Sequence, residues 1–312
     1  MDGAFIIDKP EGITSHDVVY RLRRAVRMKR VGHSGTLDPF ATGVLVVCVG
    51  RATRLSKFLV GLDKEYEAVV RLGFATDTQD LTGKPITPIR SSNGLSPEGI
   101  RKALAEFSGP QMQTPPMFSA KKVSGERLYK AAREGREVER EPVAITVHSI
   151  ESLESGEALP APNGDGTRDL RIRVRCSSGT YVRTLAHDLG ALLGVGAHLA
   201  GLRRTAVGEF DISRAITLDE AEKAGREGGL GRHLIGMADV PAHLPRVVLD
   251  AGEVDDVVHG RAIRAPERAR STLAGDYQGV RLCDESGRLV AMGEYSEASG
   301  VIKPRVVLAE GV

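Results

Sequence analysis

One uninterrupted apolar run constrains the fold of this chain more than any other feature. The residues between Gly43 and Gly50 read Val-Leu-Val-Val-Cys-Val, and most of them are β-branched. An apolar run of this length between glycines is typical of a strand buried inside a sheet. The 312-residue chain is long enough to bury a core around such a strand. We therefore expect a sheet that contains residues 44–50.

Apolar periodicity and turn residues predict further elements along the chain. Strands are expected at 4–7, 64–72, 143–150 and 170–176. Helices are expected after the capping box of Thr14 and Asp17 and at 95–107 and 125–134, and another after the turn at 177–181, with leucines 185, 189, 192 and 193 directed inward. The segment from Thr76 to Ser96 is rich in Thr, Pro, Gly and Ser, which predicts a long loop.

A boundary is predicted at the segment Pro241-Ala-His-Leu-Pro245. Beyond it the pattern changes to short apolar runs separated by glycine turns, at 247–249, 280–283, 289–291 and 306–308. This change predicts a small β-rich domain of about 65 residues at the end of the chain.

Composition excludes several classes of protein. The apolar run near the start is four residues long, too short for a signal peptide or a membrane span, so we expect a cytoplasmic protein. The three cysteines are far apart and suggest neither a disulfide framework nor a zinc site. The net charge is only +2, but six of the ten residues from Arg21 to Arg30 are cationic. Such a cluster is either a solvated helix face or a surface for a phosphate backbone.

The loop Gly32-His-Ser-Gly-Thr-Leu-Asp-Pro39 directly follows this basic run and admits four interpretations. A nucleophilic Ser34 is disfavoured because the fifth position of the elbow motif is threonine and no strand is expected before it. A phosphate-binding loop lacks its Gly-Lys-Ser/Thr, and a metal pair of His33 and Asp38 lacks a third ligand. The fourth interpretation is that Asp38 is presented by a turn to which the glycines give backbone freedom. Asp38 is then either an ordinary turn residue or a covalent nucleophile.

The loop also carries a family resemblance. Residues 32–43 strongly resemble the catalytic motif of the bacterial TruB-type tRNA pseudouridine-55 synthases, apart from Ser34, where alanine or threonine is more usual. Matching segments occur in the same order along the chain: Asp8-Lys-Pro10, Thr14-Ser-His-Asp17, Lys64-Glu-Tyr66, Thr114-Pro-Pro116, Ser119-Ala-Lys121 and Ser178-Gly-Thr-Tyr-Val-Arg-Thr184. The tail, with Gly260-Arg-Ala-Ile263 and the closing Lys303-Pro-Arg-Val-Val-Leu308, is similar to the small PUA-type RNA-binding domain that ends many members.

The resemblance implies a site made of side chains alone, with no cofactor and no metal. It assigns Asp38 as the nucleophile, Arg183 as the cation that keeps Asp38 ionised, and Tyr66 as the ring that stacks on the uracil. His33 would fill the space left by a flipped base, and Tyr181 and Leu202 would line the pocket. Attack by Asp38 on the sugar and attack on the base both stay open.

The resemblance also implies a fold and a partner. The fold would be an α/β (α+β) protein with a mixed, largely antiparallel sheet flanked by helices and a small C-terminal β-rich PUA-like domain. We expect a catalytic domain at 1–240, with an RNA-contacting insertion at about 76–140, and the PUA-like domain at 246–312; no role is predicted for the segment 154–168. The partner would be the T arm of tRNA, with no membrane and no obligate protein partner, and we expect a monomer. The alternative is a non-catalytic RNA-binding or tRNA-folding protein that uses the same surface.

Overall fold

A computed structural model describes residues 1–119, 122–123, 126–154, 159–269, 273 and 275–309. Ala120, Lys121, Gly125 and residues 155–158 of the segment 154–168 therefore lie outside the described residues. The chain divides into two compact units. Unit 1 consists of Met1–Asp38, Val44–Gly61 and Gly208–Val312, and unit 2 consists of Pro39–Gly43 and Leu62–Val207. The domain boundaries expected from the sequence stay a prediction.

In the first part of unit 1, helices pack on a run of strands that belongs to an 11-stranded sheet. The order of these strands is β12–β1–β3, with β2 antiparallel to β3, β13 antiparallel to β1, and β12 parallel to β1. The strands and helices of this part are β1 (Gly3–Lys9), α1 (Ser15–Val26), β2 (Val31–His33), β3 (Thr42–Val49), the 3-10 helix η1 (Gly50–Leu55), α2 (Ser56–Val60), β11 (Phe210–Asp211), η2 (Ile212–Arg214), β12 (Ile216–Thr217), α6 (Leu218–Glu227), η3 (Leu230–His233) and β13 (Ile235–Gly236). The buried strand predicted at 44–50, the first strand and the first helix are confirmed.

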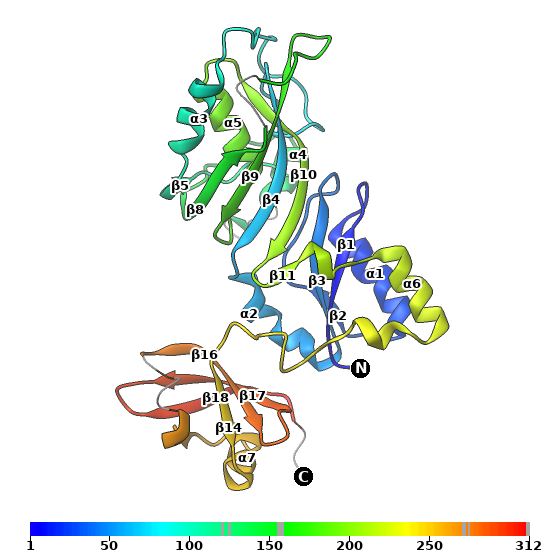
Figure 1. The fold of residues 1–312 in the computed structure, drawn as a ribbon, viewed down its shortest axis with the longest axis vertical. Helices are drawn as coiled ribbons and strands as arrows, with labels where there is room; N and C mark the ends of the chain where they lie inside the picture. Colours follow the sequence, from blue (N-terminus) through cyan, green and yellow to red (C-terminus); the bar gives the residue numbers. More distant parts are fainter. Residues whose placement is uncertain (120–121, 124–125, 155–158, 270–272, 274, 310–312) are drawn as a thin grey trace. The chain divides into compact units, whose positions relative to one another are not determined.

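Helices α1 and α6 lie side by side (Figure 1) and run in the same direction. Arg21 of α1 pairs with Asp219 and Glu222 near the start of α6, at 2.7 Å to each. One turn further along, Gly225 of α6 approaches Ala25 so closely that a Cβ at position 225 would lie 2.7 Å from the Ala25 carbonyl oxygen. The apolar faces of both helices form one core with β1 and β3. These contacts fix α1, and with it the loop that α1 touches at its first residue.

The C-terminal part of unit 1 is a separate five-stranded sheet with its own core. The order is β14–β16–β17–β18–β15, and the pairs are antiparallel except for β14 with β16. Its elements are β14 (Arg246–Leu249), α7 (Ala251–Val258), β15 (Ile263–Arg264), η4 (Glu267–Ala269), β16 (Tyr277–Asp284), β17 (Leu289–Ser296) and β18 (Val301–Val307). The β-rich C-terminal segment is confirmed, whereas α7 was not predicted.

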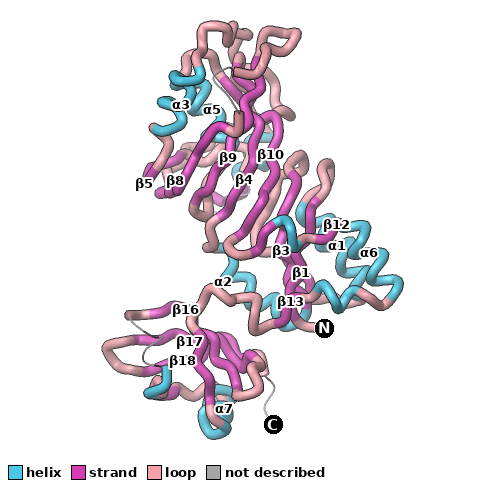
Figure 2. Tube along the Cα trace, viewed as in Figure 1, coloured by secondary structure: helices cyan, strands magenta, loops and turns pink. Residues whose placement is uncertain are grey.

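Unit 2 is built on a long antiparallel sheet in the order β10–β4–β9–β8–β5 (Figure 2). Its elements are β4 (Lys64–Leu72), α3 (Pro97–Ala105), β5 (Gly109–Gln113), β6 (Lys122–Val123), β7 (Glu126–Arg127), α4 (Leu128–Arg133), β8 (Val143–Ser152), β9 (Arg168–Cys176), α5 (Val182–Leu192) and β10 (Ala197–Val207). The loop predicted at 76–96 has no helix or strand. Parallel pairs are few in both units, so the mixed, largely antiparallel sheet flanked by helices is confirmed.

One prediction about the packing of α5 is wrong. Leu185 and Leu189 are buried as expected, but Leu192 is 48% exposed and Leu193 is half-buried. The helix ends at Leu192, and the chain then turns through Gly194 and Gly196, both with positive φ, into β10. The apolar face therefore stops covering the sheet one turn earlier than the leucine spacing suggests. In the part of the chain that the structure describes, no helix combines the length and apolarity needed to cross a membrane.

Candidate active site

The loop around Ser34 directs this serine into the protein. Ser34 is 3% exposed, its N–H donates to the carbonyl of Val46 at 3.0 Å, and its hydroxyl donates to the same oxygen at 3.4 Å. The expectation that no strand precedes Ser34 is wrong, because the short strand β2 ends at His33. That strand is extended by its pairing with β3 rather than by its own composition. A buried, hydrogen-bonded hydroxyl is nevertheless a poor nucleophile, so the loop does not act as a serine elbow.

The backbone just before Asp38 is fixed by the first residue of α1. The Ser15 hydroxyl accepts from the N–H of Leu37 at 2.9 Å and donates to its carbonyl at 3.2 Å, and both side chains are buried. Thr14 and Asp17 form the predicted capping box at this end of the helix. Asp38 follows Leu37 directly and is half-buried. The carboxylate thus extends from a backbone held at a defined place.

His33 and Gly43 mark the two ends of the same loop. The Nδ1 of His33 accepts from the N–H of Gly35 at 3.3 Å, which restrains the ring. Gly43 has φ of 101°, and a Cβ there would lie 2.2 Å from the carbonyl oxygen of Arg204. Gly32, in contrast, has room for a side chain. The loop therefore requires glycine at Gly43, whereas Gly32 and Gly35, the two glycines expected from the sequence to give the turn its backbone freedom, do not have a positive φ.

Tyr66 and Leu202 lie on the same face of the sheet in unit 2. Tyr66 of β4 is opposite Arg204 of β10, and Ala68 is opposite Leu202. Opposite residues of an antiparallel pair, and residues two apart on one strand, point to the same side. Tyr66 and Leu202 are thus diagonal neighbours; Tyr66 is 8% exposed, and Leu202 is half-buried. The structure brings these two predicted site residues together.

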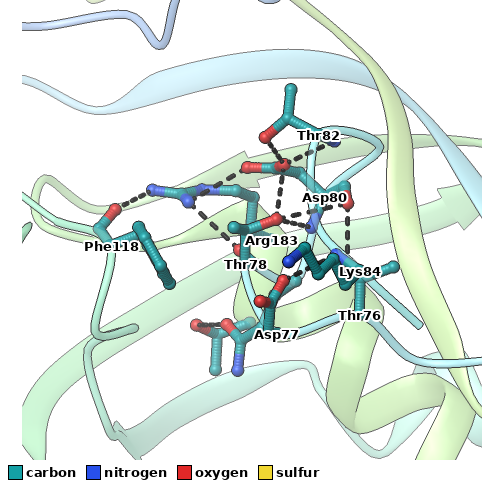
Figure 3. A network of polar contacts seen from close by, with 10 residues as sticks. Thr76, Asp77, Thr78, Asp80, Thr82, Lys84, Phe118 and Arg183 are labelled. Atoms are coloured by element: carbon teal, nitrogen blue, oxygen red, sulfur yellow. Dashed lines mark hydrogen bonds and ion pairs between the residues drawn. The ribbon is translucent and has the colours of Figure 1, made fainter. Parts of the chain in front are cut away.

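Arg183 is buried at the start of α5 in a set of hydrogen bonds (Figure 3). Its guanidinium donates to the Asp80 carboxylate at 3.1 Å, to the Thr78 carbonyl at 3.2 Å and to the Phe118 carbonyl at 2.8 Å. The side chains of Arg183 and Asp80 are only 6% and 5% exposed. The second oxygen of Asp80 accepts from the hydroxyls of Thr78 and Thr82 and from the N–H of Thr82. A planar guanidinium held in this way has a fixed orientation.

Tyr181 precedes Arg183 by two residues and is held by one amide side chain. Its N–H donates to Oε1 of Gln113 at 2.8 Å, and its carbonyl accepts from Nε2 of the same glutamine at 3.1 Å. Gln113 is the last residue of β5. The pair of bonds attaches the entry to α5 to the edge of the sheet.

Asp38 and His33 belong to unit 1 or its loop, whereas Tyr66, Tyr181, Arg183 and Leu202 belong to unit 2. The predicted pairing of Asp38 with Arg183 stays a prediction. Sequence reasoning missed three residues that position the others, Ser15, Asp80 and Gln113. The alternation of threonine and acidic residues in Thr76-Asp-Thr-Gln-Asp-Leu-Thr82 was the available signal for Asp80.

Lys64 is a further buried cation on this sheet. It lies opposite Cys176 of β9 and is 8% exposed, and its Nζ donates to the Leu62 carbonyl at 2.6 Å. Burial, together with the charge of Arg204, lowers the pKa of its ammonium to about 8. Among the described residues, no group of three or more His, Cys, Asp or Glu side chains could hold a metal ion.

Comparison with known proteins gives matches along the chain. Residues 23–182 match the model of the TruB family pseudouridylate synthase (N terminal domain), and residues 183–237 match that of the tRNA pseudouridylate synthase B C-terminal domain. The tRNA pseudouridine synthase B of Opitutus terrae is 52% identical over 71% of this chain and 88% of its own length. That of Bacillus pumilus is 38% identical over 99% of this chain and 98% of its own length. A chain in the crystal structure of a Cbf5–Nop10–Gar1 complex matches with a TM-score of 0.74 and 26% identity, over 99% of this chain and 85% of that one.

Proposed function

Because the chain belongs to the TruB family of pseudouridylate synthases, we propose that it converts uridine 55 in the T loop of tRNA to pseudouridine, with Asp38 as the nucleophile. In this isomerisation the bond from N1 of uracil to C1′ of the ribose breaks and a bond from C5 to C1′ forms. N1 gains a proton, and the hydrogen on C5 leaves as a proton. The atoms balance without an external group.

The geometry of the Asp38 loop is the observation that carries this proposal. Ser34 is turned inward. The two hydrogen bonds between the Ser15 hydroxyl and the backbone of Leu37, called the Ser15 clamp below, fix the backbone from which Asp38 extends. A nucleophile gains rate when its position is set before the substrate arrives. A carboxylate can divide the substitution into two easier steps through a covalent intermediate.

The bases of a tRNA loop are stacked, so uridine 55 would have to leave the stack to reach Asp38. In the proposal, Tyr66 stacks on the flipped uracil, and Leu202, its neighbour on the same sheet face, covers the ring edge. Tyr181 lines the pocket, and His33 occupies the space from which the base departed. Arg183 supplies the positive charge that keeps Asp38 ionised.

Tritium release tests the proposal. tRNA carrying tritium at C5 of its uridines is incubated with the protein, with uridine 55 replaced in a second tRNA. Of the two tRNAs, we expect release from the first one only. An isolated T-arm hairpin that contains uridine 55 should also release tritium. Asp38→Asn should stop release while filter binding of tRNA survives, whereas Asp165→Asn, a change in an exposed turn, should leave the rate unchanged.

Three results of the tritium-release experiment would contradict the proposal or a part of it. Full activity of Asp38→Asn would refute the nucleophile assignment. Binding of tRNA by the wild-type protein without any release would favour the non-catalytic RNA-binding alternative. Release that survives replacement of uridine 55 would refute the position within the T loop.

A further inference from the structure

The loop segment that holds Arg183 contains a residue in an unusual backbone conformation. Gln79 lies between Thr78 and Asp80. The carbonyl of Thr78 and the carboxylate of Asp80 both accept a hydrogen bond from Arg183. The φ of Gln79 is 63°, in the left-handed region that residues other than glycine rarely adopt. Such a conformation persists only where surrounding contacts hold it, and it is common next to functional groups.

Contacts from two elements hold Gln79. Its side-chain Oε1 accepts from the hydroxyl of Thr184 in α5 at 2.9 Å. Its carbonyl accepts from the N–H of Leu199 in β10 at 3.0 Å, and the N–H of Leu81 donates to the Leu199 carbonyl at 2.9 Å. The loop is therefore attached to β10 by its backbone, and Gln79 adds a bond to α5 beside those that Arg183 makes with Thr78 and Asp80.

Both residues of the Gln79–Thr184 bond are next in sequence to residues of the Arg183 contacts. Thr184 follows Arg183 directly, and Gln79 stands between Thr78 and Asp80, two of the residues that accept from Arg183. Thr184 is 4% exposed, so its hydroxyl has little access to water as a replacement partner. Any slide of the loop along α5 would separate the guanidinium from Thr78 and Asp80 together.

We infer that Gln79 is a positioning residue for the isomerisation, which acts through Asp80 on the orientation of Arg183 by means of its bond to Thr184. The inference rests on the proposed function, because it assigns Arg183 to the reaction. Gln79 itself touches no reacting atom. Its loss should slow the chemical step and leave tRNA affinity unchanged.

Paired substitutions on both sides of the bond test this inference. Gln79→Met keeps the length and removes the acceptor, whereas Gln79→Glu keeps an acceptor oxygen. Thr184→Val keeps the shape and removes the donor, whereas Thr184→Ser keeps it. Gln79→Met and Thr184→Val should lower the single-turnover rate about tenfold with an unchanged Kd for tRNA. Gln79→Glu and Thr184→Ser should stay close to the wild-type rate.

Two controls separate positioning from a general loss of stability. Thr53→Val removes a similar threonine bond, to the Gly50 carbonyl in unit 1, and should leave the rate unchanged. In an Asp80→Asn background, Gln79→Met should cause no further loss, because the contact through which it acts is already altered.

Hydrogen exchange provides a readout that does not depend on turnover. The amide of Leu81, which donates to Leu199, should exchange faster in Thr184→Val than in Thr184→Ser, since the loop loses one of its bonds to α5. Two outcomes would overturn the role of Gln79 and leave the proposed function intact. One is an active wild type with a Gln79→Met variant that keeps the full rate, and the other is a rate loss in Gln79→Met that multiplies with the loss in Asp80→Asn. An inactive wild type would overturn the proposed function, and unchanged exchange would overturn the fastening role.

Discussion

At the scale of single residues, the surroundings of Arg183 determine what its replacement does. Arg183→Met leaves the carboxylate of Asp80 buried with its ion pair removed, and breaking a buried pair costs about 3–5 kcal/mol. Arg183→Lys keeps a charge but offers no planar fork to reach Asp80, Thr78 and Phe118 together.

We expect Arg183→Met to unfold at lower urea concentration than the wild type and, where folded, to turn over far more slowly. Arg183→Lys should be intermediate in both measurements. An unchanged turnover rate of folded Arg183→Met would remove Arg183 from the mechanism, even if its stability fell.

Lys64 gives the stability a pH dependence with a definite sign. Its pKa of about 8 lies below the value of an exposed lysine, about 10.4, so between these values the unfolded chain binds more protons than the folded one. Stability therefore rises with pH across this window, by up to about 1.4 kcal/mol for each unit between the two pKa values. Burial raises the pKa of Cys176 to about 11, which acts in the opposite direction above about pH 8.5.

Comparison with Lys64→Met isolates the lysine. Urea unfolding from pH 7 to pH 10 should show the variant more stable than the wild type at pH 7, with the difference shrinking as the pH rises. A difference that is constant over this range would mean that Lys64 titrates as an exposed lysine does.

Among the helices and strands, the sequence predicted those features that depend on neighbouring residues, such as the bounds of a strand and the cap of a helix. The alternation in Lys64–Leu72 corresponds to a strand with the same bounds, and the capping box at Thr14 is present. Strand β10 was missed because Gly201 and the pair Arg203-Arg204 interrupt its alternation, and its register shifts twice along β4. Likewise, the contact of Arg183 with Asp80 was not predicted, because the two residues are 103 apart in the sequence and only the folded loop brings Asp80 to α5.

The start of α1 allows helix stability and loop position to be separated. Thr14→Ala removes the cap and should lower the free energy of unfolding by about 1 kcal/mol, with little change in the rate of the folded enzyme. Ser15→Ala removes both bonds to Leu37 and should lower the turnover rate severalfold with tRNA affinity retained. The measurements are urea unfolding and single-turnover tritium release. If Ser15→Ala kept the full rate, the Ser15 clamp would not position Asp38.

At the scale of the whole molecule, the net charge of +2 conceals an uneven distribution of cations. From the sequence, the run from Arg21 to Arg30 is either a solvated helix face or a surface for a phosphate backbone, but in the structure some of its arginines bind groups of the protein itself. Arg21 pairs with α6, and Arg23 donates to the carbonyl of Val31. The exposed cations of the run are Arg24, Arg27, Lys29 and Arg30, at or just after the end of α1. Because α1 and α6 run in the same direction, the exposed Arg226 lies at the corresponding end of α6. Sequence spacing alone could not separate the two groups, since the division depends on what α6 brings beside α1.

This division predicts two kinds of response to the loss of an arginine. Each phosphate contact contributes roughly 0.7–0.9 to the slope of log affinity against log salt concentration. Arg27→Gln with Arg30→Gln should therefore weaken tRNA binding and lower this slope, without changing the urea midpoint. Arg21→Gln, from the same run, should lower the urea midpoint and leave the slope unchanged, because its charge is already used by Asp219 and Glu222. If both variants lowered the slope equally, the whole run would bind RNA and the ion pairs with α6 would not persist in the complex.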